Sequence, residues 1–466
     1  MPIETRSIDW VPLHERHGKV GAQGRFWFLG NFHFFTISIG FIGPGMGLGL
    51  GWTILAGTLG ILIGTVFQAF HASQGAEMGL PQMIQSRAQF GYRGVILPLA
   101  ATLVTYIGFN VVDTILIAGG LSSLAGLNQI LVAVGVSVVA AVLAIWGHDW
   151  LHLVFGWLFW ISVPLFTTLS LAVLFGWHVA AGPVPAARGF GAVAFFTQLA
   201  AGASYNITYA TYVSDYSRYL PPTTPRGRII ASVFLGAAGS AIWLIALGAW
   251  LATRMGGEDA LADLSRAGDL LRPGLGAVLA AVSVAALVAT MGMNAYSGML
   301  TVITAIDSLH AVRPTRRLRV MCIVGLTAGW TLLAVVSGGR AIDVLTVAFV
   351  VMLYLLAPWT AINLIDYFFV RRGRYAVMDL FAPNGIYGAW RREGLLAYGL
   401  GLLASLPFCV LPGIFTGFAA RALGGVDVGW LVGIGATGGC YLVLTRHFDA
   451  TVEAGAVAAS EQALLG

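Results

Sequence analysis

The feature that most limits the fold of this chain is a series of apolar runs, each long enough to cross a lipid bilayer. A membrane-spanning helix needs about 20 mostly apolar residues to bridge the hydrocarbon core. Apolar residues make up 58% of the chain and charged residues only 10%, so the runs predict one all-α, multi-pass membrane domain. The twelve runs lie at residues 26–50, 51–74, 95–121, 128–147, 151–178, 192–213, 229–253, 275–303, 319–337, 341–370, 395–417 and 426–445.

The basic residues predict which ends of the helices face the cytoplasm. Lys and Arg gather in the short cytoplasmic loops of membrane proteins. With the N-terminus inside, 19 of the 25 basic residues fall in cytoplasmic segments, which predicts twelve spans in the inner membrane with both termini cytoplasmic. The net charge of +5 therefore reflects topology, and we expect no nucleic-acid partner. The six basic residues left outside are Arg188, Arg254, Arg266, Arg272, Arg340 and Arg421.

The ends of the chain and one loop are polar. Residues 1–24 lack an apolar core, so no cleaved secretory peptide is expected. They form a predicted cytoplasmic tail, as do residues 447–466, around a transmembrane domain at 25–446. The loop at 254–274 carries mixed charge and predicts an exposed external segment with a short helix. The three cysteines lie in separate apolar runs without metal-binding spacing and are predicted to be packing residues.

One carboxylate interrupts the third run. Asp113 lies near the middle of a predicted span, with no Lys, Arg or Glu between Arg93 and itself. A charged Asp at the centre of a membrane helix costs about 2.5–3.5 kcal/mol, and such residues are functional by default. Phe109 is one turn earlier on the same face, and an aromatic ring above a buried acid suits a flat molecule that carries N–H donors. The alternative is that Asp113 caps a broken neighbouring helix through its backbone N–H groups.

Two runs carry sequences that disfavour a continuous helix. The first contains GFIGPGMGLGLG at residues 40–51, where the GPG tripeptide predicts a break. The sixth crowds small and polar residues into positions 201–213. Interruptions at matching places in two halves of a transporter indicate an inverted repeat with a central site, whereas the flanking glycines alone would serve close helix packing. The predicted repeats are residues 25–178 and 192–370, followed by two helices at 395–446.

The eighth run holds an amide, Asn294, in an otherwise apolar helix. An amide without a hydrogen-bond partner is costly in such a place, so Asn294 must bond either a neighbouring helix or a ligand. Thr290 lies one turn earlier on the same face, and Ser297 and Thr301 continue the polar line. Hydroxyl groups in membrane helices often bond only their own backbone, so these three are weaker candidates.

Three sequence blocks resemble those of one transporter family. SYNITYATYVSDYSRYLP (204–221), GLPQMIQSRAQFGYRG (79–94) and LLAPWTAINLIDYFFVRRGRY (355–375) are similar to blocks of the nucleobase–cation symporter-1 (NCS1) family, purine–cytosine permease type. The resemblance implies the LeuT-type fold, in which ten of twelve helices form two inverted five-helix repeats. It also implies a symporter, not an enzyme, that imports a nucleobase such as cytosine or a purine with H⁺ or Na⁺ by alternating access.

The resemblance also implies a substrate site. Family members commonly hold the ring between an aromatic residue on the third helix and one on the sixth, which correspond here to Phe109 and Tyr209. An Asn or Gln usually follows the first aromatic by one turn, and here that position is Asp113. An ionised carboxylate only accepts hydrogen bonds, which favours a substrate with adjacent N–H groups or a proton-linked cycle. Asn294 corresponds to the amide that contacts the ring edge. The first-helix residues expected near the substrate are Phe35, Thr36 and Ser38.

The coupling ion is expected to be H⁺ or Na⁺, with no other cofactor. Sodium-coupled relatives place carbonyls of the first helix against hydroxyls of the eighth, which puts a predicted Na⁺ site near Asn31, Phe34, Ala285 and Thr290. The eighth helix offers one hydroxyl there where two are usual, and a missing oxygen ligand weakens a site for a hard cation. Protons are therefore slightly favoured, with Asp113 as the candidate carrier.

Other functions fit the sequence less well. An intramembrane enzyme needs a nucleophile–base pair or a metal set, and the chain has no HExxH, no GxSxG and no Asp pair within the membrane, so no catalytic residue is assigned. A passive channel is a further alternative, which would not accumulate its substrate. Within the transporter class, the alternative substrates are hydroxymethylpyrimidine, allantoin and hydantoin-like rings. We expect a monomer in the lipid bilayer with a small-molecule substrate.

Overall fold

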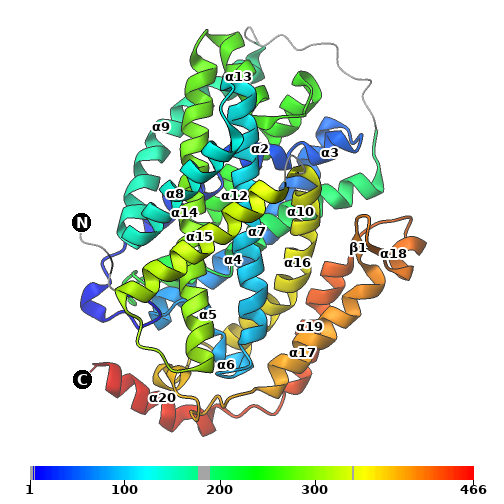
Figure 1. Ribbon diagram of the computed structural model, residues 1–466. Helices are drawn as coiled ribbons and strands as arrows, with labels where there is room; N and C mark the ends of the chain where they lie inside the picture. Colours follow the sequence, from blue (N-terminus) through cyan, green and yellow to red (C-terminus); the bar gives the residue numbers. More distant parts are fainter. Residues whose placement is uncertain (1–3, 5, 177–188, 338–340, 466) are drawn as a thin grey trace.

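The described chain is a bundle of long helices (Figure 1). The structure is a computed structural model that describes residues 4, 6–176, 189–337 and 341–465. Arg188 and Arg340, two of the basic residues predicted to face outside, lie outside the described residues, as does the predicted end of the first repeat at residue 178. A short helix, α13 (Ala260–Leu271), lies at one end of the bundle, and α20 (Ala450–Leu465) lies across the other.

The helices differ widely in length. The longer ones are α1 (Val20–Gly30), α4 (Leu50–Met78), α7 (Ile96–Ala125), α8 (Gln129–Trp146), α9 (His148–Phe175), α10 (Ala192–Tyr209), α12 (Arg226–Met255), α14 (Leu275–Leu309), α15 (Arg316–Ser337), α16 (Ala341–Ile365), α17 (Arg392–Ser405) and α19 (Gly429–Leu444). The shorter ones are η1 (Leu13–Glu15), α2 (Phe34–Ile39), α3 (Ile42–Gly45), α5 (Gln82–Gln85), α6 (Arg87–Phe90), α11 (Val213–Ser217), η2 (Asp366–Val370), η3 (Val377–Phe381), η4 (Leu406–Phe408) and α18 (Phe418–Ala422). Two short strands, β1 (Val410–Leu411) and β2 (Phe415–Thr416), pair antiparallel.

Each of the twelve predicted runs contains a helix. Within the described ranges, eight helices are long and apolar enough to cross a membrane, or nine if the bent pair formed by α1 and α2–α3 counts as one span. The other three runs hold α10, α17 and α19, of 18, 14 and 16 residues. The multi-pass architecture is therefore confirmed, whereas the count of twelve spans stays a prediction.

The break in the first run is not where the sequence predicted it. The chain bends by 56° between α1 and α2–α3, at residues 31–33, whereas the GPG tripeptide at 43–45 lies in or at the end of the short helix α3. Proline is tolerated in the first turn of a helix, where its missing N–H has no partner to lose. The actual break is fixed by other helices, because the Asn31 side-chain amide donates to Asn206 Oδ1 and to the Ala237 carbonyl, both at 3.0 Å. This tertiary support has no local sequence signal.

The sixth run is interrupted as predicted, because residues 210–212 separate α10 from α11. α10 packs closely against α4 through glycines. A Cβ atom on Gly60 would lie 2.2 Å from the Leu199 carbonyl oxygen, and one on Gly64 would lie 2.4 Å from that of Ala203. Small residues at such a seam let two backbones meet, so this seam fixes the interrupted segment against the second span.

The run at 395–417 is not one continuous helix. α17 ends at Ser405 and is followed by η4 and the β1–β2 hairpin. Pro407 and Pro412 have no backbone N–H to continue a helix, and Gly413, at φ 73°, occupies a left-handed turn that glycine accepts without strain. The run is long and mostly apolar in sequence, but its prolines divide it.

Two helices lie at opposite ends of the bundle and cover its loops. α13 confirms the short helix predicted in the 254–274 loop, and its first turn is capped by Asp259, whose carboxylate accepts from the backbone N–H groups of residues 261 and 262. α20 forms within the predicted C-terminal tail. Its Glu453 accepts two hydrogen bonds from Arg371, at 2.9 and 3.0 Å, so the tail is anchored to the end of the η2 helix.

Candidate functional site

Asp113 is buried near the middle of α7 and has no protein partner. Asp113 is only 2% exposed, and its side chain makes no hydrogen bond or ion pair with any residue that the structure describes. Asp366, an equally buried carboxylate, accepts hydrogen bonds from Gln89 and Tyr375, both at 2.7 Å. Because a buried polar group without a partner is costly, Asp113 needs either a proton or a ligand. Among the described residues, no backbone N–H group of a broken helix donates to Asp113.

Four aromatic rings cluster beside this helix. The Phe35 ring centroid lies 5.8 Å from that of Phe109, 5.6 Å from that of Tyr205 and 5.9 Å from that of Phe349. The rings of Phe109 and Tyr205 are 6.3 Å apart at 52°. We call these four residues the aromatic cluster. It confirms that two predicted site residues, Phe35 and Phe109, come together, and it adds two that the sequence analysis did not single out.

Tyr209, the aromatic residue predicted to face Phe109 across the substrate, has other partners. Its hydroxyl donates to the Gly30 carbonyl at 2.7 Å, at the break after α1. Its ring lies 5.5 Å from those of Trp27 and Tyr205. Among the ring contacts of the described chain, the tyrosine that reaches Phe109 is Tyr205, one turn earlier. The role of Tyr209 as a substrate plate therefore stays a prediction, and Tyr205 is a second candidate.

Asn294 joins α14 to α7 and to the break between α10 and α11. Its amide donates to Asn110 Oδ1 at 2.9 Å, and its carbonyl oxygen accepts from the Tyr212 hydroxyl at 2.9 Å. Asn110 in turn donates to the backbone carbonyl of Met291 at 3.2 Å. In this conformation Asn294 thus bonds neighbouring helices, one of the two roles expected from the sequence. The sequence analysis overlooked Asn110, although an amide three positions before Asp113 in an apolar run was a readable signal.

The first-helix candidates line the break between α1 and α2. Thr36 donates to the Asn31 carbonyl at 2.6 Å, and its hydroxyl lies 2.8 Å from that of Tyr205. Ser38 donates to the Phe34 carbonyl at 3.2 Å. The two carbonyls predicted to hold Na⁺ therefore each accept a hydrogen bond from a hydroxyl group of the same short helix.

The two α14 residues predicted near the Na⁺ site differ in exposure. Ala285 is exposed, on the face of α14 that points away from the core. Ser283 lies against the start of α2, where its hydroxyl oxygen accepts from the Phe34 N–H at 2.7 Å. Thr290 is buried but donates to the Ala286 carbonyl of its own helix at 3.2 Å.

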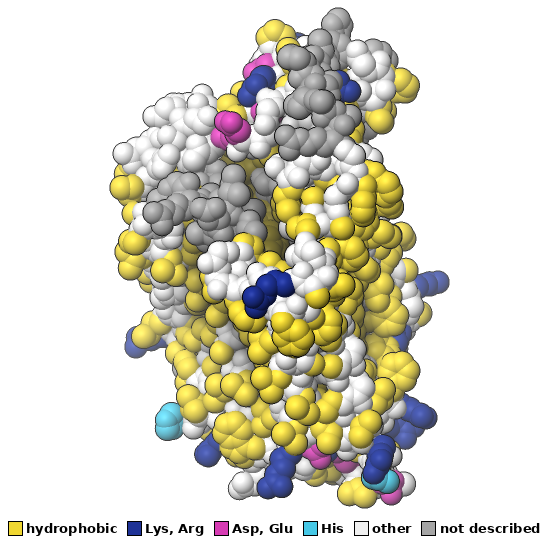
Figure 2. Space-filling view, turned by 90° about the vertical axis from the view of Figure 1, so that its right-hand side faces the viewer, with side chains coloured by type: hydrophobic (Ala, Val, Ile, Leu, Met, Phe, Trp, Pro, Cys, Tyr) yellow, Lys and Arg dark blue, Asp and Glu magenta, His cyan; other side chains and the backbone are white. Residues whose placement is uncertain are grey.

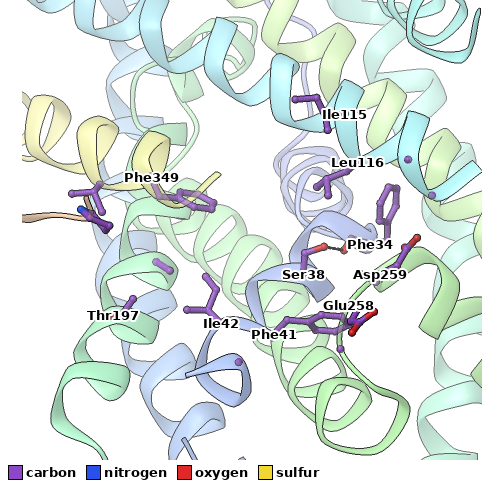
Figure 3. A pocket seen from close by; sticks show the side chains of 18 of the residues that line it. Phe34, Ser38, Phe41, Ile42, Ile115, Leu116, Thr197, Glu258, Asp259 and Phe349 are labelled. Carbon is purple, nitrogen blue, oxygen red and sulfur yellow. Dashed lines mark hydrogen bonds between the residues drawn. The ribbon is translucent and has the colours of Figure 1, made fainter. Parts of the chain in front are cut away.

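A cavity of about 840 Å³ opens at the end of the bundle that carries α13. Figure 2 shows the surface hollowed in its upper half, and Figure 3 shows side chains from several helices converging on this space. Phe34 and Ser38 line it, as does Phe349, so the aromatic cluster borders the cavity. Asp113 is not in the wall, but the next residue, Thr114, is. Three acidic residues also line it, Glu258, Asp259 and Asp427.

The opposite end is closed by a buried ionic network around Glu4. Its carboxylate accepts hydrogen bonds from Tyr219, from Tyr296 at 2.9 Å, and from Arg218 and Arg319 at 3.4 Å each. Burial acts to raise the pKa of Glu4, but the two arginines outweigh it and hold this pKa below its usual value. We call these five residues the closing network. It ties the first described residues to the turn after α11, to α14 and to α15.

Broken helices around a buried unpaired acid, a cavity open to one end and a network closing the other define a multi-pass membrane transporter. Residues 10–433 match the family described as permeases for cytosine/purines, uracil, thiamine and allantoin. This match covers most of the chain, which therefore belongs to that family, and it confirms the resemblance to the purine–cytosine permease type of the NCS1 family. The chain is accordingly a transporter and not an enzyme.

Individual relatives agree with this assignment. The chain is 35% identical over 450 residues to a putative purine-cytosine permease of Bacillus subtilis, YxlA, covering 96% of both chains. It is 25% identical over 274 residues to the purine-cytosine permease FCY21 of Saccharomyces cerevisiae, covering 56% of this chain and 50% of the relative.

Two solved structures share the fold at low sequence identity. Mhp1, an NCS1 transporter in a closed conformation with bromovinylhydantoin bound, superposes with a TM-score of 0.75 at 18% identity, covering 96% of both chains. A Na⁺-coupled sialic acid symporter in a substrate-bound outward-open state gives a TM-score of 0.61 at 13% identity, covering 94% of this chain and 92% of that one.

Proposed function

We propose that this protein is a proton-coupled symporter that imports a nucleobase such as cytosine or a purine. The observation that carries the proposal is Asp113, a buried carboxylate without a protein partner, beside an aromatic cluster that borders a large cavity. The family assignment supports a heterocyclic substrate, and the Bacillus relative is named as a putative purine-cytosine permease. A related ring is the alternative, because the Mhp1 structure holds a hydantoin.

Substrate recognition would combine stacking with hydrogen bonds. The ring would enter from the cavity and displace Phe35 from its place between Phe109 and Tyr205, where flat rings favour offset or edge contacts. Asp113 would accept hydrogen bonds from adjacent N–H groups of the base. Asn294 keeps one amide hydrogen and one acceptor position beyond its bonds to other helices, so it would read the ring edge.

Proton coupling is favoured over sodium coupling because the first-helix carbonyls already accept hydrogen bonds within the protein. Those of Asn31 and Phe34 accept from Thr36 and Ser38, and Thr290 bonds its own helix. A hard cation would have to displace both hydroxyls and would still meet few oxygen ligands. Asp113, which needs a partner, would carry the proton instead.

The transport cycle would be alternating access in a twelve-span LeuT-type fold of two five-helix repeats. The breaks in the first and sixth runs and the likeness to Mhp1 support this fold. The cavity would face outside and the closing network the cytoplasm, because basic residues gather at the end that carries the network (Figure 2). Release of substrate would require the network to open.

Uptake into proteoliposomes tests the proposal. We expect concentrative uptake of radiolabelled cytosine or a purine, driven by an inward proton gradient, abolished by a protonophore and unchanged when potassium replaces sodium. Uracil, allantoin, hydroxymethylpyrimidine and a hydantoin complete the substrate panel. Strict dependence on sodium would refute proton coupling, and equilibration without accumulation or counterflow would indicate a channel.

A further inference from the structure

A second cavity, of about 550 Å³, lies at the closed end of the bundle. It is bounded on one side by the end of the η2 helix and the turn after it. The C-terminal end of α19 and the turn that leads to α20 form the other side. The lining residues that matter here are Phe369, Arg371, Arg372, Arg374, Leu442 and Arg446. We call this space the arginine cavity.

Three of its four arginines lack a carboxylate partner. Arg371 is neutralised, because it pairs with Asp366 and donates two hydrogen bonds to Glu453. Arg372 and Arg374 are exposed and make no side-chain hydrogen bond or ion pair to any described residue. The side chain of Arg446, also exposed, donates only to a ring nitrogen of the adjacent histidine, at 2.9 Å. The cavity thus concentrates positive charge that the protein itself does not compensate.

The wall beside these arginines is apolar and exposed. Phe369, in the last turn of a membrane span, is 68% exposed, and Leu442, in the last turn of α19, is 47% exposed. The arginines follow these residues by a few positions along the chain. The cavity therefore lies where apolar spans end and charged turns begin, which is the level of the lipid headgroups. A small soluble anion would use the arginines only, whereas an acidic phospholipid would use both surfaces.

We propose that the arginine cavity binds the phosphodiester headgroup of an acidic phospholipid, with its acyl chains against Phe369 and Leu442. Guanidinium groups bind phosphate oxygens in a bidentate manner, and basic pockets between spanning helices are known hosts for such headgroups. The shared chemistry is a phosphate anion, and the exposed apolar wall assigns it to a lipid and not to free phosphate. A bound lipid joins the end of the η2 helix to α19 and to the start of α20. This inference does not depend on the transported substrate.

Thermal unfolding of the purified full chain in a neutral detergent tests the proposal, because a ligand that binds the folded state raises the melting temperature. We expect phosphatidylglycerol to raise the melting temperature of the wild type in a saturable manner, and phosphatidylcholine not to do so. In the variant R372Q/R374Q/R446Q the half-saturating concentration should rise tenfold or more. The control variant R313Q/R316Q/R317Q removes the same charge from exposed positions just before and at the start of α15 at the same end, and should stay within twofold of the wild type.

A second measurement needs no variant. The wild type is released for native mass spectrometry from micelles that hold equal amounts of both lipids. More phosphatidylglycerol than phosphatidylcholine should stay bound to the protein. Equal retention, or an equal loss of affinity in both triple variants, would overturn the site. Inorganic phosphate is the third arm: if it alone reproduces the stabilisation at millimolar concentration, the assignment to a lipid is overturned.

Discussion

Different interactions hold the open end and the closed end of the bundle in the conformation of this structure. The open end is a cavity of about 840 Å³ that borders the aromatic cluster, where four rings touch without a charged contact among them. The closed end is held by buried charges, with Glu4 among two arginines and two tyrosines. Apolar ring contacts are individually weak, whereas buried ion pairs are costly to separate. The comparison teaches that this conformation is fixed at the closed end and adaptable at the open end.

The acid between the two ends gives the largest expected effect. Asp113→Asn keeps the shape of the side chain and removes its charge, so the fold should survive while concentrative uptake falls about 100-fold through loss of a charged hydrogen bond and of the proton carrier. Uptake and melting temperature of the purified variant are the measurements. A variant with normal uptake and an unchanged pH profile would show that this acid is structural and takes no part in transport.

Glu4→Gln weakens the closed end. It removes the charge that compensates Arg218 and Arg319. The equilibrium between the closed and open states of this end should therefore shift toward the open state by about 2 kcal/mol, or roughly 30-fold. Labelling of a cysteine placed at buried Ser297 of α14, in a background without the native cysteines, should speed up accordingly. Glu15→Gln is the control, because its partner Arg6 lies in the half-exposed tail, and it should change the labelling rate less than threefold.

The pH dependence of the stabilisation by Glu4 gives a second test of the same prediction. The pKa of Glu4 is lowered in the folded protein, so its stabilising contribution is present above the ordinary value of 4.5 and is lost as the pH falls through the lowered value. The difference in melting temperature between the wild type and Glu4→Gln should therefore be constant from about pH 6 to 8 and shrink in stronger acid. A difference that grows on acidification would contradict the assigned sign.

Phe349→Ala tests how adaptable the open end is. Loss of this ring should widen the aromatic cluster toward the cavity and shift the preference between bicyclic purines and cytosine by about fivefold. Leu116→Ala, in the same cavity wall but outside the cluster, should shift it by less than twofold. Competition against radiolabelled uptake measures both. Equal shifts would mean that the cluster does not select the ring.

The smallest effect is expected from the exposed acid Glu258 at the open end. Glu258→Gln should change KM for an uncharged base by less than about twofold, because exposed charges are screened by solvent and salt. Any difference should vanish at 0.5 M salt, a concentration at which the screening length is about 4 Å. A salt-resistant change of fivefold or more would place substrate contacts farther out than the aromatic cluster.

The sequence predicted the membrane class, the family and the buried position of Asp113, because apolar length, loop charge and an isolated acid are local signals. It misplaced the first break, since GPG at 43–45 fits inside a short helix while Asn31 breaks the chain through bonds to distant helices. It missed Tyr205 because one helical turn separates it from Tyr209, and only packing decides which ring reaches Phe109. Local patterns thus predict elements, whereas contacts between elements select among neighbouring side chains.

The anchoring of α20 has a consequence for how the protein is made. Arg371 ends a span and is almost fully buried, and its second carboxylate, Glu453, follows 82 positions later. Arg371 is synthesised before Glu453, so its guanidinium group has Asp366 as its carboxylate partner until α20 has been made. A truncation between residues 454 and 464 would keep Glu453 but would shorten the helix that holds it.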